Sequence, residues 1–157
     1  MSAEVQQVRA EIRDWFFNIY IPYGISAMNG DHPDGAHGFL RFWGRPLLLN
    51  SEQPNFSGWL MTDEQVYGVM KAMTDKLVAS GYRNTVVPDS RIFVYNRTGG
   101  AIEVIWSRRD EDGKEVQRIV VQFNVAKLDN DWRFVAVHSR VTDPAKDKDS
   151  LDLAWEQ

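Results

Sequence analysis

Two polar side chains, Asn124 and His138, stand among apolar residues in the last third of the sequence. An imidazole in apolar surroundings can act as a general acid or base, because its ordinary pKa of about 6.5 lies near neutral pH. A neutral amide can donate a hydrogen bond to a developing negative charge without any change in its protonation. We therefore treat His138 and Asn124 as candidate catalytic residues. A satisfied core or rim histidine and a solvent-facing asparagine are the alternative interpretations.

Aromatic residues make up 12% of the chain, which is many for one small domain. Most of them are expected to pack in a core, but small-molecule pockets are also apolar and contain only a few convergent polar groups. We expect Tyr20 to be a third catalytic or hydrogen-bonding residue in such a pocket. The residues expected to surround a ligand there are Trp15, Tyr23, Trp43, Trp106, Phe123 and Phe134.

Several other reaction chemistries lack the residues that they need. The chain has no cysteine, which excludes disulfides, cysteine-ligated metals and thiol catalysis. Residues 31–37 contain two histidines and two aspartates, but their spacing matches no strong metal-binding motif and favours a solvated loop. Arg108 and Arg109 are interpreted as the charged end of a strand rather than as a phosphate site. We expect neither a metal nor a cofactor.

The balance of charge is weakly acidic: 18 Lys and Arg face 22 Asp and Glu, for a net charge of -4. A nucleic-acid binder needs a basic stripe to neutralise phosphates, so we expect no nucleic-acid partner. No stretch approaches the roughly 18 apolar residues of a membrane span, and the first 30 residues do not resemble a signal peptide. These features predict a cytoplasmic protein with no membrane partner.

The first half of the chain has helical periodicity. Apolar residues recur every three or four positions over residues 3–20, which predicts an amphipathic helix that is interrupted at Pro22. A shorter helix is expected over residues 35–44, and a short edge strand over residues 47–49 directly after a proline.

A third helix and a series of strands are expected in the rest of the chain. Thr62 and Gln65 have the spacing of a capping box, and the helix that they begin is expected to end near residue 80. From residue 84 the apolar period changes to 2, and turn sequences separate the strands, which predicts an antiparallel meander and an α+β fold. The expected strands cover residues 85–96, 101–109, 115–128 and 132–141.

The chain is long enough for one domain, which we place at residues 1–142. Residues 143–157 form a charged C-terminal tail. Its apolar residues Leu151, Leu153 and Trp155 leave open whether the tail is disordered or folds onto a neighbouring subunit.

Two stretches carry a resemblance to a known superfamily. Residues 112–115 (DGKE) read as a hairpin followed by a long strand, and residues 131–139 (DWRFVAVHS) look like a closing strand. With the order of elements over residues 3–141, they resemble the nuclear transport factor 2-like superfamily, which includes ketosteroid isomerase, scytalone dehydratase and SnoaL-like polyketide cyclases. The stretches PLLL, LVASGY and WSRRDEDGKEVQR resemble an uncharacterised branch.

The resemblance implies a cone: a strongly curved antiparallel sheet wrapped around the N-terminal helices, with a deep apolar cavity and a homodimer formed through the sheet. Ketosteroid isomerases have an oxyanion donor near the position of Asn124, and scytalone dehydratases use cavity histidines, as His138 would be here. The isomerases' general base is missing, because Leu49 and Asn50 stand where its carboxylate is expected, with Glu52 nearby.

We therefore expect the protein to bind a small, mostly apolar molecule in the cone cavity. Whether it is an enzyme is left open. A cofactor-free isomerase, dehydratase or cyclase step is the expected class of reaction, because such steps need only positioned acids and donors. The alternative is a non-catalytic dimeric interaction module whose cavity is filled by its own side chains.

Overall fold

One continuous helical rod begins the chain. The computed structural model describes residues 2–156, and in it α1 (Ala3–Arg13), the π-helix η1 (Asp14–Tyr20) and α2 (Ile21–Met28) follow without a break. The predicted interruption at Pro22 is wrong. In a regular α-helix the ring of a proline clashes with the carbonyl four residues earlier. Before Pro22 the helix instead makes a wider π-helical turn, in which Ile21 N–H donates to Phe16 O, and the helix continues through the proline.

The chain then turns back as the 3₁₀-helix η2 (Gly35–Arg41), followed by β1 (Trp43–Glu52) and β2 (Asn55–Leu60). The predicted edge strand at 47–49 is wrong in its position, because β1 pairs with β2 on one side and with β7 on the other. The pairing of β1 with β7 skips from Trp43 to Leu48, so Pro46 lies where no ladder hydrogen bond is needed. The edge of the sheet is β2 instead.

The capping box and the meander are confirmed. Thr62 Oγ1 accepts from Gln65 N at the start of α3 (Asp63–Ala79), and the Gln65 side chain accepts from Thr62 N. The first predicted strand is divided into two, and each half pairs with β5. The strands are β3 (Asn84–Val86), β4 (Ser90–Asn96), β5 (Gly99–Arg109), β6 (Glu115–Leu128) and β7 (Asp131–Val141).

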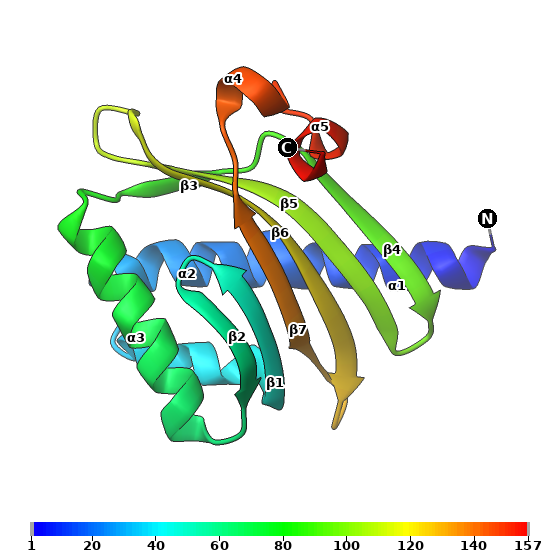
Figure 1. Ribbon diagram of the computed structural model, residues 1–157. Helices are drawn as coiled ribbons and strands as arrows, with labels where there is room; N and C mark the ends of the chain where they lie inside the picture. Colours follow the sequence, from blue (N-terminus) through cyan, green and yellow to red (C-terminus); the bar gives the residue numbers. More distant parts are fainter. Residues whose placement is uncertain (1, 157) are drawn as a thin grey trace.

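The strands form one seven-stranded sheet in the order β2-β1-β7-β6-β5-β3, and β4 also pairs with β5. All pairs are antiparallel except β1 with β7. The sheet is curved but not closed, and the long rod crosses behind it while α3 lies along one side (Figure 1). We call the face toward the helices the inner face. The predicted α+β fold with its curved sheet and N-terminal helices is confirmed.

A β-bulge in β7 decides which side chains reach the inner face. Asn124 of β6 pairs with Ala136, but the next residue, Val125, pairs with Phe134, so Val135 is the extra residue. A bulge of this kind shifts the two-residue alternation of side chains by one position. Phe134 therefore lies on the inner face before the bulge, and Val137 lies on the same face after it.

The C-terminal residues fold onto the opposite, outer face of the sheet. Helix α4 (Pro144–Asp147) and helix α5 (Leu151–Trp155) follow β7, and Leu151 and Ala154 bury Ile105 and Val120. Figure 1 shows both helices above one end of the sheet. The sequence left open whether the tail is disordered or folds onto a neighbouring subunit, and neither is seen, because the tail packs on the chain's own sheet.

A buried ion pair fastens the tail to the sheet. The Arg118 guanidinium donates to both carboxylate oxygens of Asp147, from Nε at 2.8 Å and from Nη2 at 2.6 Å. Thr142 Oγ1 and the Asp149 N–H donate to the same carboxylate. Burial alone would raise the pKa of Asp147, but the hydrogen bonds from Arg118 and its neighbours outweigh burial and lower this pKa.

We expect Asp147→Asn to lower the free energy of unfolding by about 3 kcal/mol, because it leaves the buried Arg118 without its main counter-charge. Urea unfolding at neutral pH measures this. Asp149→Asn is the matched control: Asp149 also pairs with Arg118 but is exposed, so its loss should change stability by less than about 1 kcal/mol. Equal effects of the two substitutions would contradict the role given to Asp147.

The same pair predicts a pH dependence. Since the folded-state pKa of Asp147 lies below its unfolded value of about 3.9, the unfolded chain takes up a proton first on acidification. The stabilisation by this carboxylate is complete above that value and is lost as the pH falls through the folded-state pKa. Urea unfolding between about pH 5 and pH 2 should show a steeper loss of stability in the wild type than in Asp147→Asn. Parallel curves would contradict this.

Candidate functional site

A cavity of about 70 Å³ lies between the inner face of the sheet, α2 and α3. Each water molecule needs about 10–15 Å³ by such a measure, so the cavity holds roughly five waters or one small organic group. Its walls are mainly apolar and come from elements far apart in the sequence. They include the side chains of Leu49, Met70, Trp106, Val121, Phe123 and Val137.

Local sequence explains why these side chains meet. Leu47, Leu49 and Ser51 alternate on β1, and Ile119, Val121 and Phe123 alternate on β6, so each set projects from one face of its strand. The apolar stripe of α3 covers them with Val66 and Met70. Met28, Met70 and Met73 all line the cavity, and the flexible thioether side chain of methionine can adapt to the shape of a bound molecule.

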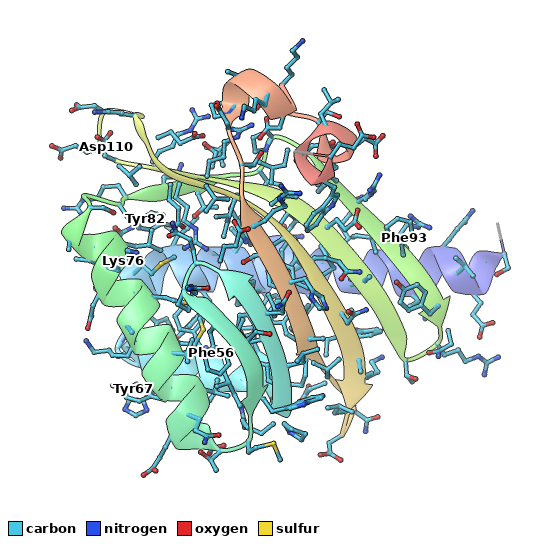
Figure 2. The ribbon with its side chains drawn as sticks, in the orientation of Figure 1. Phe56, Tyr67, Lys76, Tyr82, Phe93 and Asp110 are labelled. Carbon is cyan, nitrogen blue, oxygen red and sulfur yellow. The ribbon has the colours of Figure 1, made fainter. Side chains whose placement is uncertain are left out.

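Polar side chains gather at one end of the cavity, and most of them have partners. Ser51 and Ser139 are hydrogen-bonded to each other, and Gln53 Oε1 accepts from Gln117 Nε2 at 2.9 Å. Thr85 Oγ1 lies 2.6 Å from the hydroxyl of Tyr82, which Figure 2 shows beside the C-terminal end of α3. These groups are satisfied within the protein.

Arg108 is different, because no carboxylate among residues 2–156 forms an ion pair with it. The side chain is half-buried and lines the cavity, and its Nε is buried without a hydrogen-bond partner. It forms no ion pair within residues 2–156, and its guanidinium lies 5.7 Å from the centre of the Trp106 ring. Burial lowers the pKa of Arg108, and the nearby phenols of Tyr82 and Tyr20 oppose this shift.

Two further hydrogen-bond donors belong to the same cavity. Tyr20 is buried, and burial raises its pKa despite the opposing charge of Arg108, so its hydroxyl stays protonated at neutral pH. The buried indole Nε1 of Trp43 lies beside this hydroxyl, and a hydrogen bond between the two side chains also opposes the rise in the pKa of Tyr20. The cavity therefore presents Arg108 and Tyr20 as donors, whereas no Asp, Glu or His lines it in the described part of the chain.

The structure brings only some of the sequence-predicted residues together. Tyr20, Trp43, Trp106 and Phe123 line the cavity, and their contact with a ligand stays a prediction. Trp15, Tyr23 and Phe134 do not line it. Trp15 and Phe134 pack against each other with ring centres 4.8 Å apart, and the Tyr23 hydroxyl donates to Gly35 O.

His138 and Asn124 lie on the outer face, so the predicted position of both in the cavity is wrong. His138 Nδ1 lies 3.2 Å from Asn50 Oδ1, and the side chain alternates with the inward-facing Val137 and Ser139. Asn124 alternates with the inward-facing Phe123. Strict alternation from Phe134 placed His138 inward, and the bulge at Val135 reverses that assignment.

Arg108 is the site residue that sequence reasoning missed. We interpreted Arg108 and Arg109 together as the charged end of a strand. The two-residue period of a strand could have identified it, because this period puts Arg108 on the same face as Trp106, which was expected in the pocket. Arg109 belongs to the opposite face, where it donates to Ser107 Oγ at 3.1 Å.

The loop of residues 31–37, with its two histidines and two aspartates, contains no cluster of metal ligands. His37 stacks on Tyr67 with ring centres 4.1 Å apart, and His32 packs on Tyr23. Across residues 2–156, no three side chains of the ligating types His, Asp and Glu come together in a way that could hold a metal ion. No helix of the same residues is long and apolar enough to cross a membrane.

The sequence of residues 10–142 matches the family model described as NTF2-like protein (DUF6841). The chain belongs to this family. The resemblance to the nuclear transport factor 2-like superfamily is thereby confirmed. Among curated proteins, none matches the sequence.

Solved structures share the fold at low sequence identity. An NTF2-like protein with a cystatin-like fold from Novosphingobium aromaticivorans is 15% identical with a TM-score of 0.63, and the match covers 88% of this chain and 84% of that one. A protein of unknown function from Nostoc punctiforme is 16% identical (TM-score 0.60; 83% and 90% covered). The yeast UBP3-associated protein BRE5 is 12% identical (TM-score 0.59; 83% and 95%). These similarities establish the fold alone.

We expect Arg108→Met to raise the free energy of unfolding by about 1 kcal/mol, because it removes a buried polar group that has no partner. Urea unfolding in the absence of added ligands measures this. Arg109→Met, whose side chain faces the other side of the sheet, should bring no gain. A lower free energy of unfolding in Arg108→Met would show that the guanidinium stabilises the fold and is not kept for binding a ligand.

Proposed function

We propose that this NTF2-like protein binds a small, mostly apolar molecule in the cavity between α2, α3 and the inner face of the sheet. The observation that carries the proposal is the buried donor Arg108 Nε, which belongs to the cavity wall and has no hydrogen-bond partner within residues 2–156. Buried donors are nearly always hydrogen-bonded in folded proteins, so an unpaired one at the wall of an apolar cavity favours a missing acceptor. A bound molecule would supply it.

The side chains that line the cavity favour the binding of a ligand over a reaction that transfers a proton. An isomerase, dehydratase or cyclase step needs a group that accepts a proton near neutral pH. The phenol of Tyr20 is a poor base because burial raises its pKa further, and none of the described lining residues is a carboxylate or histidine. Since His138 lies outside the cavity, we propose a binding protein rather than a cofactor-free enzyme.

A cavity-filling substitution tests the proposal. We expect benzyl alcohol, a compact neutral probe, to change the fluorescence of Trp43 and Trp106, which line the cavity. Val121→Phe places a ring in the cavity and should weaken binding at least tenfold. His138→Ala, whose side chain is on the outer face, should leave the affinity within about twofold, well under the 1.4 kcal/mol of a tenfold change.

Two results would contradict the proposal. One is the absence of any saturable response of the wild type to benzyl alcohol. The other is equal affinity in Val121→Phe and the wild type, since a filled cavity cannot bind the same molecule. Either result would favour the alternative, a non-catalytic interaction module.

The homodimer through the sheet and the cytoplasmic location remain proposals. Helix α5 already covers Ile105 and Val120, so a second copy would have to use the rest of the outer face, around β1, β2 and β7. Trp59 of β2 is 60% exposed there and lies opposite Leu48 of β1. An exposed aromatic beside an apolar residue is typical of an interface. Sedimentation velocity measures the oligomeric state directly.

A further inference from the structure

We infer that the molecule bound in the cavity carries a carboxylate, which pairs with the guanidinium of Arg108. This inference rests on the proposed function and adds the chemical class of the ligand. It depends on three observations, which concern the charge, its position in the cavity and the space around it.

The first observation is that the guanidinium charge of Arg108 has no ion-pair partner within residues 2–156. An ionised group in a protein interior is stable only when it is paired and hydrogen-bonded, and breaking such a pair is strongly unfavourable. The protein follows this rule on the outer face, where the buried guanidinium of Arg118 bonds to Asp147, Asp149 and Glu115. On the inner face, within residues 2–156, no carboxylate reaches Arg108. An anionic ligand would supply the counter-charge.

A planar monoanion fits this charge better than a phosphate does. Arginine is the one cation that lines the cavity in the described part of the chain, so the doubly charged phosphate would remain half-neutralised in an apolar space. A carboxylate has one negative charge, and its two oxygens match the fork of the guanidinium.

The position of Arg108 also orients the ligand. Arg108 pairs across the sheet with Thr85 and Gln117, at the polar end of the cavity, whereas Trp106, two residues earlier, belongs to the apolar wall with Phe123. The carboxylate would therefore lie at the polar end, with the apolar body of the ligand toward Phe123 and Val121.

A second, more open hollow of about 420 Å³ adjoins this polar end. Gln53 and Leu77 line both spaces, and Lys76, labelled in Figure 2 on α3, lines the outer one. Glu115 and Arg118, which also line this hollow, pair with each other, so Lys76 would attract an anion toward the polar end of the cavity. The inner volume of about 70 Å³, with adaptable methionines around it, suits a compact body such as one ring or a short branched chain.

The test compares two molecules of nearly the same shape, benzoate and benzamide, by isothermal titration at pH 7. We expect wild-type protein to bind benzoate at least tenfold more tightly than benzamide. Arg108→Gln should abolish this preference by weakening benzoate, while benzamide affinity stays within about twofold. Arg109→Gln is the matched control, because this adjacent arginine faces the outer side, and it should keep the full preference.

The outcomes separate the carboxylate inference from the proposed binding function. Equal affinity of the wild type for benzoate and benzamide, or an unchanged preference in Arg108→Gln, overturns the carboxylate inference and leaves the proposed function standing. Failure of both molecules to bind overturns the proposed function and the inference with it.

A measurement on wild-type protein covers the case in which Arg108→Gln does not fold. The arginine Nε–H signal that disappears in Arg108→Lys identifies Arg108 in the nitrogen–proton NMR spectrum. We expect benzoate, but not benzamide, to shift this signal in the wild type in a saturable way. Absence of a benzoate-specific shift overturns the inference.

Discussion

The packing around Phe134 holds the two layers of the molecule together. This fully buried ring lies between 4.6 and 4.8 Å from the rings of Trp15, Tyr20, Trp43 and Phe123, measured between ring centres. Those neighbours belong to the helical rod, to β1 and to β6, so one contact group joins the helices to three strands. Aromatic packing of this kind contributes both buried area and preferred ring geometry.

The same group closes one end of the cone and thereby defines the cavity. Tyr20, Trp43 and Phe123 contact Phe134 on one side and line the cavity on the other. Beyond them the side chains become smaller and then polar, toward Ser51, Ser139 and Arg108. The aromatic residues of this protein are therefore divided between filling the closed end and forming the wall of the remaining space.

Two arginines, Arg118 and the half-buried Arg108, show how differently the two faces of the sheet are used. Arg118 is tied to Asp147 by two short hydrogen bonds and fixes the C-terminal helices to the outer face. Arg108 has the ring of Trp106 and the phenols of Tyr20 and Tyr82 nearby, but no ion-pair partner among residues 2–156. Arg118 therefore has the surroundings of a structural ion pair, whereas Arg108 has those of a group that could bind an anion.

Local patterns in the sequence determined the elements and the fold class. The capping box at Thr62, the change of period near residue 84 and the hairpin turns depend on neighbours within a few residues, so they could be predicted, as could the NTF2-like fold. The continuation of the helix through Pro22 depends on a π-helical turn that no propensity indicates.

Only the tertiary structure decided which residues form the site. A single extra residue at Val135 reversed the face of His138, because a one-residue shift in a strand turns every later side chain over. Arg108 looked like the charged end of a strand, and it became a site residue only because the fold places it on the cavity wall beside Trp106. Burial and the absence of a counter-charge are properties of the packed molecule, and no local pattern encodes them.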